Sequence, residues 1–595
     1  MKKLIIYLSI TVLLLGCEDV LDKKALDSID NTDVWNDVDL STYYLNNVYA
    51  NVLPSFGGGS NTNISLESTG SGTDNMMYGE LTTSSSYGIF GATTYSNIRE
   101  LNVFLEEIDK GTLTEEEKAP LKGQAFFLRA WLYWELLKYY GGIPLVLEYQ
   151  DPFKYEEMLV ERNSARECIE QIVADLEAAE INLPPDWPSS ERGRIPRAAA
   201  AALKGRVLLF YASPQFNPDN LQDRWQWAYD ANLAAKNLCL EDGFSLHENY
   251  TSIFLDEEKS TEALFITVYD GINKSHGYEN SVRPRSECND GGNKNNPTWE
   301  FVKDYPMKDG KPIDGHPDYE EQTYWKNRDP RFYATIAYNG CTWELGGQAG
   351  RRQWTYINND QEPNSPAEGA SNTGFYCRKN VNEAITKTET DRTPTDWIEI
   401  RMTEVLLNLA ECAAELGKLE EARNELIAVR KRAGIEAGSD GLYGIVANDI
   451  TSMVEAVMLE RQIELAFENK RHWDLRRRNL FAEDYGNISK YNGTRRHGIQ
   501  TLLNTNYIMM LDPGVSGDSV YNHFNAIMRD TIDLVNHYSD YFITETDWIR
   551  ENRDINFLQP KYNFYFIPQS DLDKNEKLQQ TILWGEVNPF DPLAD

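Results

Sequence analysis

A helical hydrophobic period recurs in well-separated segments of this chain and limits the folds open to it. In the first of these segments, apolar residues follow one another in steps of three or four, at Leu121, Ala125, Leu128, Leu132, Leu136 and Tyr139. This spacing places the apolar side chains on one face of a helix. Gly141 and Gly142 end the predicted helix, and Pro144 favours an extended chain beyond it.

A second periodic segment predicts a helical hairpin. Its first apolar stripe runs through Met402, Val405, Leu406, Leu409, Ala413 and Leu416. Gly417 breaks the pattern, which resumes after it and continues up to Gly434. Helices joined by one tight break, each with a broad apolar stripe, favour stacking in the manner of tetratricopeptide repeats. The spaced Trp, Gly, Tyr and Pro residues of that repeat are not present in order, so any repeats are degenerate. Further helices are expected at 97–109, 163–182, 196–212, 225–240 and 451–478.

Polar excursions separate the helical segments, at 54–95, 270–395 and 485–560, and the two longer ones are rich in Asn, Gly, Pro, Tyr and Trp. Loops of this length inside a compact chain usually carry function. No Pro/Gly/Ser-rich linker divides the chain into globular blocks, so we expect one compact body.

We therefore predict a mostly α fold in which degenerate tetratricopeptide-type hairpins form a scaffold, capped by an irregular, loop-rich lobe with few short strands. The expected order is an N-terminal helical part at 39–269, the loop-rich lobe at 270–395 and a C-terminal helical part at 396–595.

The N-terminus predicts export and a lipid anchor. Two lysines precede an unbroken apolar run, 4–15, which is typical of a secretory signal peptide and too short to span the ~30 Å core of a bilayer. Cys17 follows Leu-Leu-Gly in a pattern that resembles the lipobox of bacterial lipoproteins, and the acidic pair behind it resembles the surface-export signal of Bacteroidetes lipoproteins. We expect 1–16 to be a signal peptide and 17–38 a tether acylated at Cys17. An ordinary secreted protein is the alternative.

The charge balance excludes several classes of partner. The chain has 58 Lys and Arg against 93 Asp and Glu, a formal net charge of −35. Such a field repels nucleic acid and anionic lipid. We therefore expect no nucleic-acid partner, and contact with the membrane through the lipid anchor only. A strongly anionic ligand is also disfavoured, although a local basic patch could override the global field.

The cysteines leave one question open. Three of the seven lie in predicted helices and are expected to be small core residues, Cys168, Cys239 and Cys412. Cys288, Cys341 and Cys377 lie in loop-rich sequence, where an oxidising envelope permits one disulfide among them.

No catalytic constellation stands out. The seven histidines are scattered without HExxH or HxxxH spacing, and GxSxG, P-loop and dinucleotide motifs are missing. We therefore expect no catalytic residue, no metal site and no cofactor. A glycoside hydrolase is the remaining enzymatic alternative, because 93 carboxylates always allow a pair whose separation the sequence does not give.

The densest charged segment begins at Glu460. Charged residues recur there at helical spacing beside apolar positions, Arg461, Glu464 and Glu468. Charges next to a buried stripe need partners, and Arg401 and Glu404 on the predicted hairpin are candidates. We expect an ion-pair network that locks helices together, with a catalytic acid–base cluster as the alternative.

The same segment resembles the ER..E...E..R..DL.R motif of the SusD/RagB family. Further blocks resemble the family in order along the chain, at 97–102, 128–146, 329–331, 401–411, 429–434, 565–568 and 575–580. The last block departs from the family at Thr581, where Asn is usual. The resemblance implies a surface glycan-binding lipoprotein of Bacteroidetes that sits as a lid on a SusC-like, TonB-dependent outer-membrane transporter and delivers oligosaccharide to it. The RagB branch leaves peptide, or another nutrient, as an alternative ligand.

Aromatic residues in the loops are the candidate ligand contacts, since ring faces pack against the apolar face of a pyranose while polar neighbours bond its hydroxyls. Beside the early helix, where the family often places its binding platform, they are Tyr87, Phe90 and Tyr95. In the lobe they are Trp343, Trp354 and Tyr356. Loop arginines could bond hydroxyls or an acidic sugar, namely Arg283, Arg285, Arg351 and Arg352. The alternative is that these aromatics are core and these arginines solvated charge.

Overall fold

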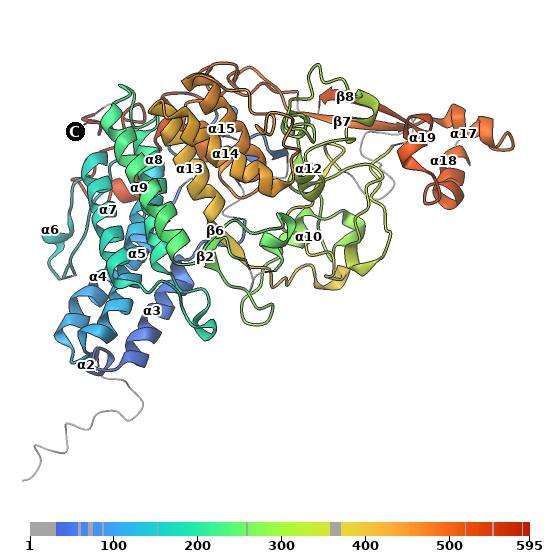
Figure 1. The fold of residues 1–595 in the computed structure, drawn as a ribbon. Coiled ribbons are helices and arrows are strands. Elements are labelled where there is room, and N and C mark those ends of the chain that lie inside the picture. Colours follow the sequence, from blue (N-terminus) through green and yellow to red (C-terminus); the bar gives the residue numbers. More distant parts are fainter. Residues whose placement is uncertain are drawn as a thin grey trace, which may run out of the picture.

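The computed structural model describes residues 31–57, 61–69, 75–85, 88–151, 153–256, 260–357, 371–517, 519–549, 552–585 and 587–594. The predicted signal peptide, Cys17 and most of the predicted tether lie outside the described residues, as does Tyr87. Helices dominate the described part, and its strands are few and short (Figure 1). The predicted mostly α fold is confirmed.

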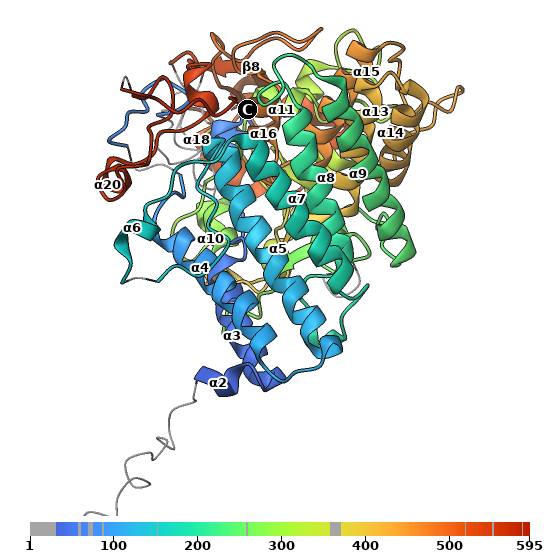
Figure 2. The ribbon, with the colours of Figure 1, turned by 90° about the vertical axis from the view of Figure 1, so that its left-hand side faces the viewer.

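The N-terminal part is a stack of helical hairpins. Its helices are α2 (Asn31–Val34), α3 (Val38–Val52), α4 (Ala92–Glu107), α5 (Glu115–Tyr140), α6 (Tyr155–Met158), α7 (Ala165–Asn182), α8 (Arg197–Ala212) and α9 (Gln222–Glu241). Helix α5 packs against α4 and α7, α7 against α8, and α8 against α9. Neighbours in sequence are therefore neighbours in space, as Figure 2 shows for α5, α7, α8 and α9.

Local signals start these helices and set their spacing. Thr114 and Glu117 form a capping box at the start of α5, and α7 begins with the same motif. Helices α8 and α9 approach closely because Gly205 has no side chain. A Cβ there would lie 2.3 Å from Asn232 Oδ1, whereas Asn232 Nδ2 donates a hydrogen bond of 3.0 Å to the Gly205 carbonyl.

The chain rejoins the stack after the lobe. Strand β6 (Trp397–Arg401) leads into α13 (Met402–Glu415), α14 (Leu419–Ala433), α15 (Ile450–Glu464), α16 (Arg471–Arg477) and, near the C-terminus, α20 (Gln569–Leu572). Helix α13 packs against α9 as well as against α14 and α15. One hydrophobic core therefore runs through both helical parts, with members from Trp35 to Ile567.

The helix predicted at 451–478 is wrong in one respect, because the chain breaks between α15 and α16. Phe467 and Asn469 in the break have φ of 58° and 61°. A residue in the left-handed region cannot continue a right-handed helix. Residues 460–464 and 471–477 therefore do not share one helix face.

A loop-rich lobe joins the two helical parts. It lies between β2 (Ala263–Thr267) and β6, which pair in antiparallel fashion. Its short elements are α10 (Tyr278–Val282), β3 (Asn296–Pro297), α11 (Trp299–Lys303), α12 (Pro330–Thr335), β4 (Ile336–Ala337) and β5 (Tyr376–Cys377). Strand β3 pairs with β1 (Ser68–Thr69), and β4 pairs with β5. The lobe has hydrophobic clusters of its own.

An arm formed by 497–549 projects from the body (Figure 1). Strands β7 (His497–Leu503) and β8 (Phe542–Ile549) pair in antiparallel fashion. They carry α17 (Thr505–Leu511), α18 (Ser519–His523), a π-helical turn (Phe524–Met528) and α19 (Leu534–Tyr541). Trp354 and Tyr356 of the lobe pack into the cluster that holds the arm together. The arm is ordered structure within the predicted excursion at 485–560.

The charged segment forms a closed ion-pair network around Glu464, here called the Glu464 network. The Glu464 carboxylate lies 2.8 Å from Arg401 and 2.9 Å from Arg331, and it also bonds Arg432. Arg401 also forms an ion pair with Glu468, at 2.8 Å. Burial raises the pKa of Glu464, but the surrounding guanidinium groups outweigh burial and hold that pKa well below its ordinary value. The predicted structural network, with Arg401 as a partner, is confirmed.

Glu404 and Arg461 belong to neighbouring pairs. Glu404 accepts a hydrogen bond of 2.6 Å from Arg206 Nε. Arg461 donates through Nε to Asp474 at 2.9 Å and through Nη1 to Asn408 at 2.6 Å. Buried charges in this region thus meet opposite charges from other helices.

The six described cysteines are buried free thiols. The disulfide that the sequence permits among Cys288, Cys341 and Cys377 does not form. Of the helices in the described ranges, none is both long and apolar enough to cross a membrane.

Candidate functional site

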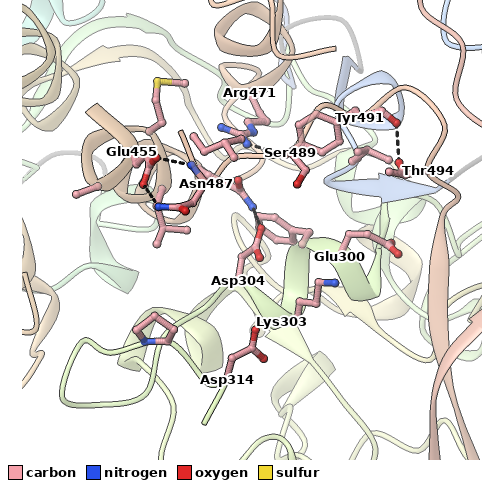
Figure 3. Close-up of a pocket in the computed structure, with 18 of the residues that line it drawn as sticks. Glu300, Lys303, Asp304, Asp314, Glu455, Arg471, Asn487, Ser489, Tyr491 and Thr494 are labelled. Carbon is pink, nitrogen blue, oxygen red and sulfur yellow. Dashed lines mark hydrogen bonds between the residues drawn. The ribbon is translucent and has the colours of Figure 1, made fainter. Parts of the chain in front are cut away.

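A pocket of about 1280 Å³ lies where the lobe meets the C-terminal helices. Most of its lining comes from 65–67, 300–314, 444–462 and 487–497, together with Arg471 at the start of α16. Figure 3 shows side chains from these separate segments converging on one space. Pockets for single small ligands hold ~300–1,000 Å³, so this one has room for a chain of several small units.

Helix α11 and the short pair β1–β3 build one wall. Thr298 caps α11, accepting a hydrogen bond from Phe301 N at 3.3 Å, and its own N–H donates to the Glu67 carbonyl at 3.1 Å. Residues 65–67 are thereby fixed beside α11. The wall presents the side chains of Glu67, Lys303 and Asp304 to the pocket.

Two carboxyl groups on this wall hold protons more tightly than usual. Glu67 is 2% exposed and accepts hydrogen bonds from Phe467 N at 2.9 Å and Ser65 Oγ at 2.7 Å. Burial raises its pKa to about 7, against the opposing effect of these bonds. Burial also raises the pKa of Asp304, which accepts a bond of 2.8 Å from Gln462 Nε2. Glu67 therefore carries a reduced negative charge near neutral pH, and both groups can form hydrogen bonds with a ligand.

The opposite wall is a loop at the start of the predicted 485–560 excursion. Asn487 anchors it to α15, because its N–H and its Nδ2 donate to the Glu455 carboxylate at 2.5 Å and 3.0 Å. Thr494 Oγ1 donates to the Tyr491 carbonyl at 2.7 Å. Ser489 and Lys490 at the tip are exposed. The loop offers amide, hydroxyl, ammonium and aromatic groups (Figure 3).

Arg471 lies between the two walls. Its Nη2 donates to Tyr491 Oη at 2.8 Å, while its Nη1 is buried and has no hydrogen-bond acceptor among the described residues. The pocket thus combines acceptors, donors and the aromatic rings of Phe301 and Tyr491, which suits a ligand rich in hydroxyl groups. No group of three or more His, Cys, Asp and Glu in the described part of the chain is arranged to hold a metal ion.

The predicted aromatic contacts of the lobe are wrong. Trp343 and Tyr356 are fully buried and Trp354 is 1% exposed. Trp354 and Tyr356 pack with Phe542 at the base of the arm, and Trp343 packs with Tyr376. A ring without an exposed face cannot stack on a sugar, so these side chains serve the core of the lobe and arm.

Arg283 is likewise corrected from a ligand contact to a structural residue. It is fully buried, pairs with Glu279 and donates to the carbonyls of Ile385 at 2.9 Å and Asn382 at 2.8 Å. Arg285 is exposed, and its predicted contact with ligand stays a prediction.

Phe90 and Tyr95 also stay predictions. They are half-buried and lie against each other with ring centroids 5.6 Å apart, and Tyr95 Oη donates to the Pro144 carbonyl at 3.1 Å. Their neighbours Ile89 and Thr94 line a second pocket of about 320 Å³. Trp131, Trp134 and Trp473 are among its lining residues, and Lys138 Nζ lies 4.5 Å from the ring centroid of Trp473.

The sequence interpretation missed the larger pocket, although it included two of its parts. One is the 485–560 excursion, which contributes the loop wall. The other is the charged motif, which contains Arg471 but does not tell which of its arginines lack a carboxylate. A pocket built from segments up to hundreds of residues apart leaves no contiguous pattern in the sequence.

Comparison with known families agrees with this architecture. Residues 261–584 match the family model described as the SusD family, and residues 19–209 match one described as starch-binding associating with outer membrane. The chain belongs to the SusD family. SusD-like protein P38 of Formosa agariphila is 23% identical over 406 residues, covering 66% of this chain and 73% of the relative. SusD-like protein P25 of the same organism is 23% identical over 399 residues, 64% and 68% of the two chains.

Solved structures share the fold. A SusD-like protein of Bacteroides fragilis superposes with a TM-score of 0.70 at 24% identity, covering 94% of this chain and 100% of that one. A laminarin-binding SusD-like protein superposes with a TM-score of 0.59 at 16% identity, covering 92% and 99%. The stacked hairpins are therefore the tetratricopeptide-like scaffold of this family.

Proposed function

We propose that this protein binds an oligosaccharide or polysaccharide in the 1280 Å³ pocket and delivers it to a SusC-like, TonB-dependent outer-membrane transporter. The observation that carries the proposal is the pocket itself. It has the size for several sugar units and offers hydroxyl-binding groups from both walls. Membership of a carbohydrate-binding family supports the ligand class.

The proposed location is the outer face of the outer membrane, with Cys17 as the acylated anchor. Its support is the short apolar run before Cys17 and the family description that mentions the outer membrane. More than one acyl chain gives stable anchoring, which a multiply acylated N-terminal cysteine would supply. Replacing Cys17 with Ala should move the protein from the membrane fraction to the soluble fraction, and unchanged retention would contradict the anchor.

The proposed role is binding without hydrolysis. Substrate must leave the protein intact if a transporter is to import it. Incubating the protein with its ligand for a day and analysing products tests this directly, because shortened oligosaccharide would favour the glycosidase alternative.

A glycan array probed with protein lacking residues 1–17 tests the ligand class, with a peptide array beside it. Glycan hits support the proposal, and hits among peptides alone would favour the peptide alternative. Calorimetry then compares two variants against the best glycan. Tyr491→Ala removes the ring of the loop wall and should weaken binding by about 1–3 kcal/mol, as for a substantial interface anchor.

Tyr43→Ala is the matched control, since Tyr43 is 65% exposed on α3 and does not line the pocket. Its affinity should equal that of the unmodified protein. Equal affinity for both variants would place the ligand elsewhere, with the 320 Å³ pocket as the next site to test.

A further inference from the structure

Arg471 is a buried cation without an ion-pair partner among the described residues. Its side chain is 5% exposed, and among the described residues no carboxylate lies within ion-pairing distance, 4.0 Å, of its guanidinium. Arg461 and Arg477, on the same charged segment, each pair with Asp474, at 2.9 Å and 2.8 Å. Arg471 instead has one neutral partner, Tyr491, and a buried Nη1 without an acceptor.

A buried, charged nitrogen without a hydrogen-bond acceptor lowers the stability of the folded protein unless a ligand supplies the acceptor. A buried charged donor left without an acceptor loses its hydration and gains nothing in exchange. Arg471 lines the 1280 Å³ pocket, and Figure 3 shows its guanidinium directed into the space between the loop wall and Asp304. The missing acceptor therefore has room to come from a ligand.

The nearest carboxyls do not supply that acceptor. Asp474 and Asp304 attract Arg471 through space without a hydrogen bond to it. Asp474 accepts hydrogen bonds from Arg461 and Arg477, and Oδ2 of Asp304 accepts one from Gln462. Glu67 uses its oxygens for Ser65 and Phe467. Neither Asp304 nor Glu67 accepts a hydrogen bond from Arg471, and burial raises the pKa of both carboxyls.

Two further cations stand at the rim. Lys303 on α11 and Lys490 on the loop are exposed, line the pocket, and have no ion-pair partner in the described ranges. Asp314 and Asp547 on the same rim carry the opposite charge. With a formal net charge of −35 on the chain, an anion would be recognised here by direct contact with Arg471 and not by the long-range field.

We propose that the pocket selects acidic glycans. An anionic group of the sugar, either a uronate carboxylate or a sulfate ester, accepts hydrogen bonds from Arg471. Lys303 and Lys490 flank the bound glycan at the rim of the pocket. Guanidinium suits both anions because its planar donors match their paired oxygens. This inference rests on the proposed glycan-binding function and adds the chemical class of the ligand.

The test is a glycan array that holds acidic polysaccharides beside matched neutral forms. Uronate polymers are paired with their carboxyl-reduced forms, and sulfated polymers with their desulfated forms, so the two arms distinguish the two anions. The expected hits are acidic and bind at least tenfold more tightly than their neutral partners. Arg471→Gln should lower the affinity for the acidic hit at least tenfold and leave neutral forms unchanged.

Arg162→Gln is the matched control for loss of a buried arginine. Arg162 is 8% exposed, donates to the carbonyls of Gly142 and Tyr140 at 2.8 Å, and lies outside the pocket lining. Its acidic-glycan affinity should be unchanged. If Arg471→Gln does not fold, the double variant Lys303→Gln and Lys490→Gln should still lower that affinity about threefold to tenfold in low salt.

The outcomes separate this inference from the function on which it rests. Neutral hits, or equal binding to both members of each pair, would overturn the acidic preference and leave glycan binding intact. Acidic hits that a folded Arg471→Gln or the double lysine variant binds with full affinity would overturn it as well. No binding to any glycan would contradict the proposed function and this inference together.

Discussion

Buried charges are paired with opposite charges in the Glu464 network, whereas buried Arg471 has no ion-pair partner among the described residues. Glu464 and Arg471 both belong to one stretch of chain, 460–477. Around Glu464, three arginines meet carboxylates from several elements at hydrogen-bonding distance. Around Arg471, the hydrogen-bonding partner among the described residues is Tyr491, and the carboxyls of Asp474 and Asp304 act only through space. In a closed network each charge depends on its partners, so the loss of one partner is costly, whereas a charge without an ion-pair partner keeps binding capacity for a ligand. Charge density alone therefore does not distinguish scaffold from site.

The largest effect should come from breaking the closed network. Glu464→Ala leaves three arginines without their shared carboxylate and should lower the free energy of unfolding by about 3–5 kcal/mol. Urea denaturation measures this loss. Glu106→Ala, which removes an exposed partner of Lys110, should change stability by less than about 0.5 kcal/mol. If Glu464→Ala were as stable as the unmodified protein, the structural role of the network would be contradicted.

The second effect separates core aromatics from ligand contacts. Trp354→Ala should destabilise the arm by about 3 kcal/mol, the lower end for truncation of a buried tryptophan, because the small cluster can partly collapse. Hydrogen exchange in the arm should accelerate while glycan affinity stays unchanged. Val535→Ala, an exposed position on α19, is the control. Lost affinity with normal exchange would restore Trp354 as a ligand contact.

The third effect is a pH dependence of the free energy of unfolding, caused by Glu67 in the pocket wall. Burial raises the pKa of Glu67 from its ordinary 4.5 to about 7. The folded state therefore keeps this proton over a range where the unfolded state has lost it. Its stabilising contribution is complete below about pH 4.5 and is lost as the pH rises through 7.

Between pH 5 and pH 7 this contribution should fall by about 2 kcal/mol. Denaturation at both pH values measures it in the unmodified protein and in Glu67→Gln, which should lack it. Burial also raises the pKa of Glu279 to about 7, and this residue contributes equally to the pH dependence of unfolding in both proteins. The difference between their pH dependences is therefore due to Glu67. Equal pH slopes would show that Glu67 is ionised in the folded state.

The smallest effect on stability should come from Arg471 itself. Arg471→Met removes a buried charge without a carboxylate partner and should change the free energy of unfolding by less than about 1 kcal/mol. Arg461→Met leaves Asp474 without one of its partners and should cost about 3 kcal/mol. Comparable losses in the two variants would contradict the contrast between network and pocket.

Helix positions were predictable because their signals are local. The segments expected at 163–182 and 196–212 correspond to α7 and α8. The break after α15 was missed, because Phe467 and Asn469 enter left-handed conformations through their surroundings and not through a glycine or proline. The lobe aromatics were misassigned because polar sequence neighbours do not reveal burial: Trp354 is covered by residues of the arm more than 170 positions away.

The helical scaffold, the family and the presence of a charged network follow from the sequence alone, since periodicity, capping and spaced motifs act within a few turns of chain. The sequence does not tell which arginines lack a carboxylate: among the described residues Arg476 bonds only carbonyl oxygens, and Arg471 bonds only Tyr491. That property depends on where distant segments place their oxygens: Asp474 and Glu411 reach Arg477, and none in the described residues reaches Arg471 within 4.0 Å. The pocket is decided in the same way, because its walls meet only when the lobe folds against the helices.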